Sequence, residues 1–292
     1  MTDVCDTKTD VCDTKTDVSD TVSDTISDID LNNKDYIFEF RTVQSSAFRV
    51  LIEALKEILT DANFQLDKSG IKLMAMDPTH TILVHLKLQS EHFEYYKCDK
   101  PMTIGVNMLN LFKLIKTMNN NDYLSFFIDK NNNNKLGVKI NNSDKKVETV
   151  YHLNLMDLQE SKITIPPAIF ESVITIPSSD FQKLMRDMTN IGENVEIKSI
   201  GEQLQFSCIG DFAQQETVMQ PTQQGIKFLK NEDPSLIIQG LFPLKYLILF
   251  TKCTNLCNSI ELYIKNDYPL IIKYTVANLG EIKLCLAPIA NK

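Results

Sequence analysis

The sequence predicts an α+β protein made of two domains of one design, and three observations support this. At 292 residues the chain has room for two domains of about 150 residues each. Short strand-like runs alternate with amphipathic helical runs, and their order in the first half returns in the second. Hydrophobic residues make up 43% of the chain and charged residues 23%, which is typical of a globular protein with a sizeable core.

The first helix follows a short strand-like run at residues 36–43. Apolar residues three or four positions apart predict one buried helical face across residues 45–64, at Phe48, Leu51, Ile52, Leu55 and Leu59. A second helix is predicted over residues 107–118. The other elements of this half are strand-like runs at residues 70–76, 81–88, 123–128, 135–140 and 147–155.

The second half repeats this order. Residues 45–48 read SSAF and residues 178–181 read SSDF, an offset of 133 that also places residues 71–73 on residues 204–206. An offset of 136 places Met108, Leu111 and Lys116 of the second helix on Leu244, Leu247 and Lys252. The repeat therefore predicts two further helices, within residues 180–188 and 243–252.

The expected domain limits follow from this repeat and from changes in composition. Between the halves, a polar stretch with a Pro pair suits an extended connector. We expect a disordered acidic repeat tail over residues 1–35, an N-terminal domain over 36–152, a connector over 153–169 and a C-terminal domain over 170–290.

The first thirty residues form a decaying seven-residue repeat, TDVCDTK. They hold nine Asp against two Lys, a balance of −7, so the net charge of −8 leaves only −1 for residues 31–292. Thr, Asp and Ser are poor helix formers and offer little to bury, so we expect disorder although Val4, Val11 and Val18 have heptad spacing. A metal site at Cys5 and Cys12 is a weaker alternative.

Motifs of the common enzymes are absent from the sequence. No two of the nine Gly lie closer than nine positions, which excludes GxGxxG, the P-loop and GxSxG. The four His lack metal-ligand spacing, and Cys253 and Cys257 lack a second pair for a zinc site, so we expect structural roles for them. We predict no catalytic residue, no metal and no cofactor. An enzyme that uses Cys253 and Cys257 or a metal is kept as an alternative.

The cysteines and the apolar runs also bear on the compartment. Seven Cys without a disulfide framework favour a reducing compartment. No run approaches the roughly 18 apolar residues of a membrane helix, and the acidic start lacks the apolar region of a signal peptide.

Each predicted helix carries two cations on the side that the core does not bury. One such pair is usually a solvated face, but four pairs in a repeated fold gather eight cations on one surface of a nearly neutral body. Lys and Arg without interleaved aromatic residues suit sequence-independent, salt-sensitive contact with the phosphates of a duplex. The eight are Arg49, Lys56, Lys113, Lys116, Lys183, Arg186, Lys245 and Lys252.

Several stretches in order along the chain carry a resemblance to a known family. They are GIKLMAMDPTHTILVHLKL, FEYYKCDKPMTIGVNMLNLFKLIK, LMDLQ, PSSDFQKLMRDMTNIGE, LKYLILFTKCTNL and the terminal LAP. From about Phe38 to Pro288 the sequence resembles the proliferating cell nuclear antigen family, the DNA polymerase sliding clamps of eukaryotes, archaea and large DNA viruses. The resemblance implies the DNA clamp (processivity) fold. In that fold, two similar domains, each with two helices on antiparallel sheets, form a homotrimeric ring around a helix-lined hole.

The resemblance also implies a function without catalysis. A sliding clamp encircles duplex DNA and tethers DNA polymerase and other replication and repair proteins. The eight cations match channel-lining positions of the family, and Lys97 and Lys100 are expected to extend the DNA-binding set. The implied partners are duplex DNA, DNA polymerase, a clamp loader, other client proteins with a short motif, and further copies of this chain.

Two contact regions follow from the resemblance. Ring closure would join an edge strand at residues 147–155 to a segment near residues 212–220 of the next subunit. Clients would insert a helical turn with aromatic anchors into a pocket beneath the connector. The matching positions, which without the resemblance are apolar loop and strand-end residues, are Met76, His80, Leu83, Ile163, Ile165, Pro269, Ala287 and Pro288.

The chain departs from the family pattern at several positions. Gly201 stands where eukaryotic clamps usually carry the lysine that is modified by ubiquitin, and Thr81 replaces a usual aliphatic residue in the pocket loop. Asn-rich runs favour an AT-rich genome, so a large DNA virus is one expected source. Nuclear localisation is expected from the resemblance, or a viral replication site if a virus encodes the chain. The alternative function is a clamp-fold DNA-binding protein that acts as a monomer or as one subunit of a heteromeric clamp.

Overall fold

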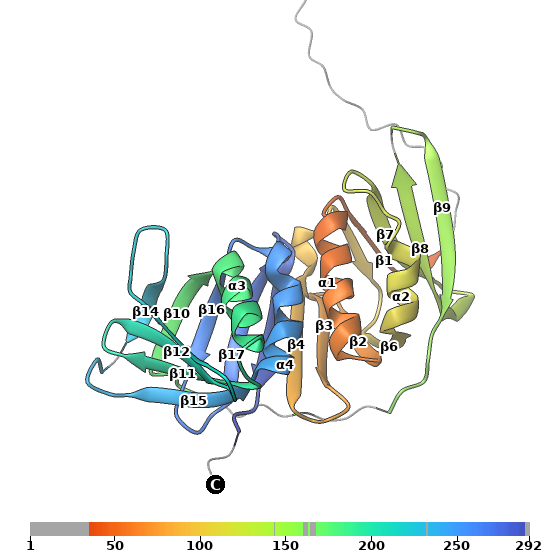
Figure 1. The fold of residues 1–292 in the computed structure, drawn as a ribbon. Helices are drawn as coiled ribbons and strands as arrows, with labels where there is room; N and C mark the ends of the chain where they lie inside the picture. Colours follow the sequence, from red (N-terminus) through yellow and green to blue (C-terminus); the bar gives the residue numbers. More distant parts are fainter. Residues whose placement is uncertain (1–34, 143, 160–162, 164–167, 232, 290–292) are drawn as a thin grey trace, which may run out of the picture. The chain divides into compact units, whose positions relative to one another are not determined.

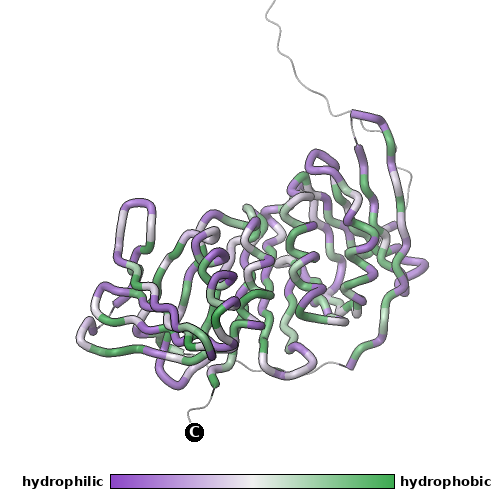
Figure 2. Tube along the Cα trace, in the orientation of Figure 1, coloured by the Kyte–Doolittle hydropathy of each residue, from purple (hydrophilic) through white to green (hydrophobic). Residues whose placement is uncertain are grey.

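The computed structural model describes residues 35–142, 144–159, 163, 168–231 and 233–289. The predicted acidic tail therefore lies, up to residue 34, outside the described residues. Helices and strands alternate between hydrophobic and hydrophilic residues, whereas most turns between strands are hydrophilic (Figure 2). None of the described helices is long and apolar enough to cross a membrane.

The first half runs strand, helix and strands twice over (Figure 1). Its elements are β1 (Tyr36–Thr42), α1 (Ser45–Ile58), β2 (Asp61–Asp67), β3 (Gly70–Met76), β4 (Ile82–Gln89), the 3-10 turn η1 (Ser90–His92), β5 (Tyr95–Cys98), β6 (Met102–Asn107), α2 (Met108–Ile115), β7 (Tyr123–Asp129), β8 (Asn132–Asn142) and β9 (Val147–Asn154).

The second half follows the same order. Its elements are β10 (Ser172–Pro177), α3 (Ser178–Thr189), β11 (Asn194–Ile200), β12 (Gln203–Ile209), β13 (Gln214–Met219), β14 (Lys227–Asn231), β15 (Ile238–Pro243), α4 (Leu244–Phe250), the 3-10 helix η2 (Thr251–Leu256), β16 (Ser259–Ile264), β17 (Leu270–Val276) and β18 (Gly280–Leu286).

Three sheets connect these strands. The first half contributes the five-stranded sheet β5-β1-β7-β8-β9, and the second half contributes the four-stranded sheet β13-β12-β11-β15. The nine-stranded sheet, β14-β10-β16-β17-β18-β4-β3-β2-β6, joins five strands of the second half to four of the first through the pair β18·β4. Neighbours in these sheets are antiparallel, which confirms the predicted α+β architecture with two helices and antiparallel sheets in each half.

The strand registers fix which residues of the two halves correspond. Residues opposite one another in β7, β8 and β9 are Phe126, Val138 and Tyr151, and in β16, β17 and β18 they are Leu262, Ile272 and Leu284. Tyr151 therefore corresponds to Leu284, again an offset of 133.

The other sheet gives a second set of correspondences. Leu73 of β3 lies opposite Leu86 of β4, and Phe206 of β12 lies opposite Thr217 of β13. Leu86 therefore corresponds to Thr217, and β4 as a whole to β13, with an offset of 131.

The segments that follow the last strand of each half also correspond. After β9, the Met156 amide donates a hydrogen bond to the Gly105 carbonyl at 2.9 Å. After β18, the Ile289 amide donates to the Leu241 carbonyl at 2.8 Å. The repeat thus extends beyond the strands to residues 154–156 and 287–289.

The four helices lie side by side along one face of the sheets (Figure 1). α1 contacts α2 within the first half, α3 contacts α4 and η2 within the second, and α1 contacts α4 and η2 across the halves. On α1 the buried residues are those that the spacing predicted, including Phe48, Leu51, Ile52 and Leu55. The helices therefore form one continuous layer with the apolar side of each toward the strands.

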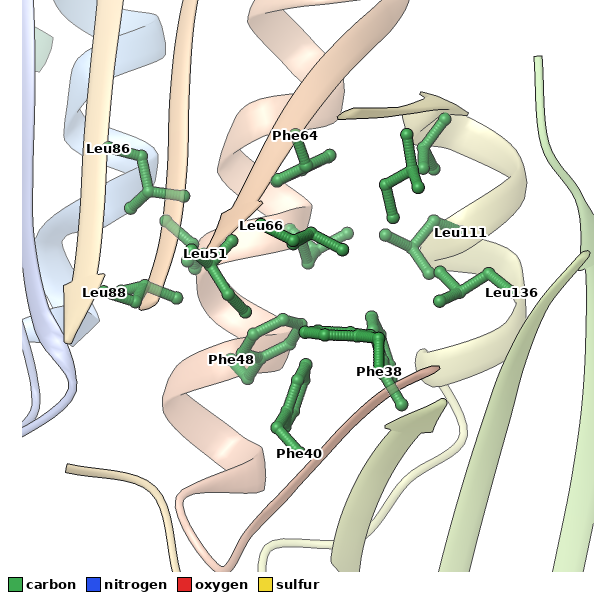
Figure 3. A pocket seen from close by; sticks show the side chains of 15 residues that line it. Phe38, Phe40, Phe48, Leu51, Phe64, Leu66, Leu86, Leu88, Leu111 and Leu136 are labelled. Atoms are coloured by element: carbon green, nitrogen blue, oxygen red, sulfur yellow. The ribbon is translucent and has the colours of Figure 1, made fainter. Parts of the chain in front are cut away.

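The first half encloses its core between this layer and the strands. Side chains from α1, α2 and both sheets meet there, with Phe38, Phe40 and Phe48 at its centre (Figure 3). They leave a cavity of about 20 Å³ lined only by apolar residues. Such a space holds no polar partner for a water molecule, so it belongs to the packed core and offers no ligand site.

The first helix is shorter than the sequence pattern predicted. It ends at Ile58, Leu59 is extended, and Asp61–Asp67 forms β2 in place of the last helical turn. In β2 the buried residues Ala62, Phe64 and Leu66 alternate with more exposed ones, the period of a strand. The prediction was wrong there because Ala62, three positions after Leu59, continues the helical spacing and also fits the alternation of a strand.

Candidate DNA interface and client pocket

The third helix presents its two cations to solvent. Phe181, Leu184, Met185 and Met188 face the core, so Lys183 and Arg186 lie on the opposite side of α3. Neither charged group has a hydrogen-bond or ion-pair partner among the described residues. Asp180 and Asp187 are exposed on the same helix. This surface therefore carries free cations interspersed with acids.

The second helix resembles the third in this respect. Lys113 lies in the last turn of α2, Lys116 follows at its C-terminal cap, and both are exposed. The N-terminus of this helix is capped by the Asn107 side chain, which accepts a hydrogen bond from the Asn110 amide. The cap fixes where the helix starts and thus which side the two lysines face.

The fourth pair is divided between two elements. Lys245 lies in the first turn of α4, where its ammonium group stacks 4.7 Å from the Tyr246 ring. The α-helix ends at Phe250, so Lys252 lies in η2 and not on the predicted continuous helix. Both lysines are exposed, and η2 follows α4 without a break.

The cations of α1 are engaged within the chain. The Arg49 guanidinium donates hydrogen bonds to the Met118 carbonyl at 2.6 Å and to Asn120 Oδ1 at 3.0 Å. The Lys56 ammonium pairs with Glu57 and lies 4.8 Å from the Phe112 ring, which leaves its side chain 15% exposed. These two cations tie α1 to α2 and to the loop that follows α2.

The eight cations thus all lie in the helix layer but, contrary to what the repeat had suggested, most of them do not occupy corresponding positions of the two halves. Only Lys116 and Lys252 occupy corresponding residues, and the other six lie on corresponding helices at different positions. Acidic neighbours such as Glu53 and Asp187 are exposed beside them. A mixed surface of this kind favours weak, sequence-independent contact with phosphates.

Lys97 and Lys100 lie elsewhere. In β5, Tyr96 and Cys98 pair with Phe40 and Phe38 of the core, so Lys97 points to the side of the sheet away from the helices. Its ammonium donates to the Tyr36 carbonyl at 2.7 Å. Lys100 lies in the turn before β6, at the end of that strand away from α2. The structure does not bring either residue to the helix layer, contrary to the expectation of one basic region.

The client-pocket residues lie mainly on the opposite face of the nine-stranded sheet. Alternation puts Leu284 and Val84 in the core and turns their neighbours outward. The register places Met76, Leu83, Cys285 and Ile271 in one row across β3, β4, β18 and β17. The next rows are charged, with Lys273 bridging Glu261 and Glu281. The row is therefore an apolar strip within a polar face.

The other pocket residues border this strip. Pro269 directly precedes β17, and Ala287 extends β18 by donating its amide to the Thr81 carbonyl at 3.2 Å. Ile163 is half-buried, whereas Ile165 lies outside the described residues.

The sequence prediction missed Cys285 and Ile271, which share the row with Leu83. Strand alternation through Ile282, Leu284 and Leu286 would have identified Cys285 as the outward residue among them.

A second hollow opens at the other side of the β3–β4 turn. It has a volume of about 720 Å³, and its walls include His80, Thr81, Lys245, Pro288 and Ile289. It therefore brings His80, Ala287 and Pro288 of the client set together with one DNA-set cation.

Asp77 shapes the turn between the two regions. Its buried carboxylate accepts hydrogen bonds from the amides of Thr79, Thr81 and Ile82. Burial alone would raise the pKa of Asp77, but these bonds and the Thr79 hydroxyl hold it below its usual value. The turn also holds His80 at a positive φ of 55°.

The cysteines and histidines form no metal cluster within the described part of the chain: no three His, Cys, Asp or Glu side chains there are grouped to hold an ion. Cys253 is fully buried, and burial raises the pKa of its thiol. Cys257 is half-buried, and its carbonyl accepts a hydrogen bond from the Ser178 hydroxyl. Cys5 and Cys12 lie outside the described residues.

Comparison with known proteins gives consistent matches along both halves. Residues 37–162 match the sequence model of the proliferating cell nuclear antigen N-terminal domain, and residues 164–289 match that of its C-terminal domain. Among similar proteins is the "Probable DNA polymerase sliding clamp 1" of Paramecium bursaria Chlorella virus 1. It is 34% identical over 265 residues, which cover 89% of this chain and all of the relative.

Proposed function

We propose that this chain, which belongs to the proliferating cell nuclear antigen family, acts as a DNA polymerase sliding clamp. Copies of the chain would close into a ring around duplex DNA and hold a polymerase to it, so that release of the polymerase from DNA does not end synthesis. The clamp would work at the site of DNA replication, in a nucleus or at a viral replication site.

The observation that carries this proposal is that two strands pair inside the chain, whereas the strands that correspond to them by the repeat lie at the open edges of their sheets. Within the chain, β18 pairs with β4. Their counterparts, β9 and β13, are end strands of their sheets. Pairing β9 of one copy with β13 of the next would repeat the internal joint and satisfy both edges.

The repeat also supplies the register of this contact. Leu284 lies opposite Val84 in the internal joint. Since Tyr151 corresponds to Leu284 and Gln215 to Val84, Tyr151 of one copy would lie opposite Gln215 of the next. Val150 and Thr149 would then face Glu216 and Thr217.

Burial at the two edges supports such a closure. The inward residues of β18 and β4, such as Leu284 and Leu86, are fully buried. Their counterparts in β9 and β13, such as Tyr151 and Thr217, are only half-buried. A neighbouring copy would cover these positions, as the internal partner covers theirs.

Repeating the internal joint from copy to copy gives head-to-tail contacts, because each contact uses two different edges, and such contacts form a ring when the rotations between copies add up to a full turn. The family resemblance sets the number of copies at three. The helix layers would then line the hole, and their scattered cations would meet the phosphate backbone without reading its sequence. This role requires cations placed around the DNA and does not require a catalytic residue.

Clients would bind on the outside of the ring. The apolar strip through Met76, Leu83 and Cys285 is the surface that a short helical motif with aromatic anchors would cover. Its position across both halves suits a polymerase, a clamp loader or a repair protein that must not block the hole. We propose the same domain limits for the clamp, with an N-terminal domain over residues 36–152 and a C-terminal domain over residues 170–290.

The test combines mass in solution with retention on DNA. Light scattering over a dilution series should give about three times the chain mass of 33.3 kDa. After loading, the protein should stay on closed circular DNA and leave when the circle is cut, because a ring slides off an end. A monomer at every concentration would contradict the homotrimer and favour a monomeric or heteromeric clamp. Release at equal rates from circular and cut DNA would contradict encirclement.

A further inference from the structure

Three large apolar side chains are exposed on two separate parts of one copy of the chain, one in the β12–β13 turn and two near the start of α2. Phe212, in the turn between β12 and β13, is 76% exposed, Leu109 on α2 is 49% exposed, and Met156 after β9 is 42% exposed. A single exposed apolar residue needs no explanation. The repeat, however, relates all three to one place.

Their counterparts meet at the internal joint. By the offsets above, Phe212 corresponds to Thr81 and Met156 to Ile289. By the helix offset of 136, Leu109 corresponds to Lys245. Thr81, Lys245 and Ile289 all line the open hollow of about 720 Å³ beside the β18·β4 pair.

We propose that Phe212 of one copy of this chain seats against Leu109 and Met156 of the next copy and anchors the joint between them. This inference rests on the proposed ring, because the ring contact is what brings the three residues together. At the β3–β4 turn the counterpart hollow is lined by His80 and Thr81, which are polar and leave it open. The joint between copies would instead be apolar and filled by an aromatic ring.

The backbone supports this placement beyond the end of the strands. In the internal joint, Ala287 donates its amide to the Thr81 carbonyl, one step past the end of β18. The equivalent bond between copies would run from the Asn154 amide to the Phe212 carbonyl. It would fix the β12–β13 turn next to residues 154–156 of the neighbour. Ile209, 77% exposed on the same turn, would flank the contact.

The occupant of this surface is therefore a second copy and not a client. The β12–β13 turn has four residues, 210–213, between its strands, whereas the β3–β4 turn has five, 77–81. The shorter turn lacks the His80 segment that walls the internal hollow. A large side chain at its tip can therefore approach the neighbour where the internal turn leaves space.

The experiment measures how the assembly dissociates on dilution. Phe212→Ala should raise the concentration of half-dissociation at least tenfold, by light scattering or by exchange of labelled subunits at lower concentration. Leu229→Ala removes a similarly exposed side chain from β14, outside the edges that meet, and should leave the value within twofold. Thermal unfolding of each variant checks that the fold is intact.

A double-mutant cycle tests the contact itself. Leu109→Ala with Met156→Ala should weaken the assembly about as much as Phe212→Ala, and the triple variant should be little weaker than either. Fully additive losses, or a Phe212→Ala protein that dissociates like the wild type, would overturn the anchor while leaving the ring in place. A wild-type chain that never assembles would overturn the ring itself.

Discussion

The strands β18 and β4 pair with each other, whereas the corresponding strands β9 and β13 each lie at the open edge of a sheet. At the joint, inward residues such as Val84 and Leu284 are fully buried. At the open edges, the corresponding Gln215 and Tyr151 are half-buried, and Gln215 is polar. The side chains at the internal joint are thus buried and apolar, as in a protein core, whereas those at the open edges are partly exposed and partly polar, as at the surface of a subunit that is soluble before it assembles.

The difference teaches how one repeated fold can close a ring. A fully apolar edge would be an aggregation hazard before assembly, since an unpaired strand accepts any other strand. Polar residues at inward positions of β13, such as Gln215 and Thr217, reduce this hazard. The joint between copies of the proposed ring would therefore be weaker than the joint inside the chain.

The largest expected effect breaks the open edge. Tyr151→Asp would place a carboxylate at a position that assembly buries without a partner, so we expect loss of the trimer at micromolar concentration. Tyr123→Asp is the matched control, because Tyr123 is exposed at the start of β7, away from the edge. Light scattering decides between them. A trimer that survives Tyr151→Asp would contradict the proposed strand pairing.

The second effect concerns the internal joint. In the monomeric Tyr151→Asp background, Leu284→Ala should lower the free energy of unfolding by about 2–5 kcal/mol, because it leaves a cavity in a fully buried row. Leu153→Ala changes the same residue type at the half-buried edge and should cost clearly less. Urea unfolding of the three proteins measures both. Equal losses would mean that the two edges do not differ in packing.

The third effect compares the cations of the two halves. Lys183 and Arg186 are exposed and make no ion pair with the residues that the structure describes, whereas Arg49 and Lys56 are held within the first half. Neutralising Lys183 and Arg186 should reduce the slope of DNA affinity against salt by up to about 0.9 per lost phosphate contact. Neutralising Arg49 and Lys56 should reduce it less and should lower stability more.

Binding to duplex DNA over a salt series, with thermal unfolding of the same variants, measures both quantities. The second-half variant should lose DNA affinity at unchanged stability. The contrary pattern, with the larger DNA effect at Arg49 and Lys56, would show that their internal hydrogen bonds give way to phosphates.

The sequence predicted the repeat and the positions of the helices, because both follow from local spacing of apolar residues. It could not predict the end of α1, since Ala62 fits both the helical spacing from Leu59 and the alternation of a strand. Nor could it place Lys97, whose side of the sheet depends on pairing with Glu39 of a strand nearly sixty residues away. Charge alone does not reveal such a partner.

The candidate site was less predictable than the fold for a related reason. The sequence pattern shows that β4 and β18 are apolar, but it does not show that they pair with each other. The outward row through Cys285 and the hollow beside Thr81 exist only because of that pairing. A residue's exposure or engagement, as at Arg49, likewise depends on loops that fold against it from far along the chain.

The smallest expected effect sharpens the comparison at a single turn. Between β2 and β3, the Asp67 carboxylate accepts hydrogen bonds from Lys72 and Ser69, which lower the pKa of Asp67 to about 2. The corresponding turn of the second half has Gly201 at a positive φ of 58°, and Ile200 stands at the position that matches Asp67. Only the contribution of the first turn to stability should therefore change at acidic pH.

Because the folded-state pKa of Asp67 lies below its unfolded value near 4, its contribution to stability is present above about pH 4 and is lost as the pH falls toward about 2. Solvent screening keeps that contribution below about 1 kcal/mol. Asp67→Asn should lower the free energy of unfolding by this amount near neutral pH, and the difference from wild type should vanish in acid. Asp144→Asn, at an exposed turn, is the control for urea unfolding across this range. A difference that stays constant with pH would assign the stabilising role of Asp67 to turn geometry, which an amide preserves only in part, and not to its charge.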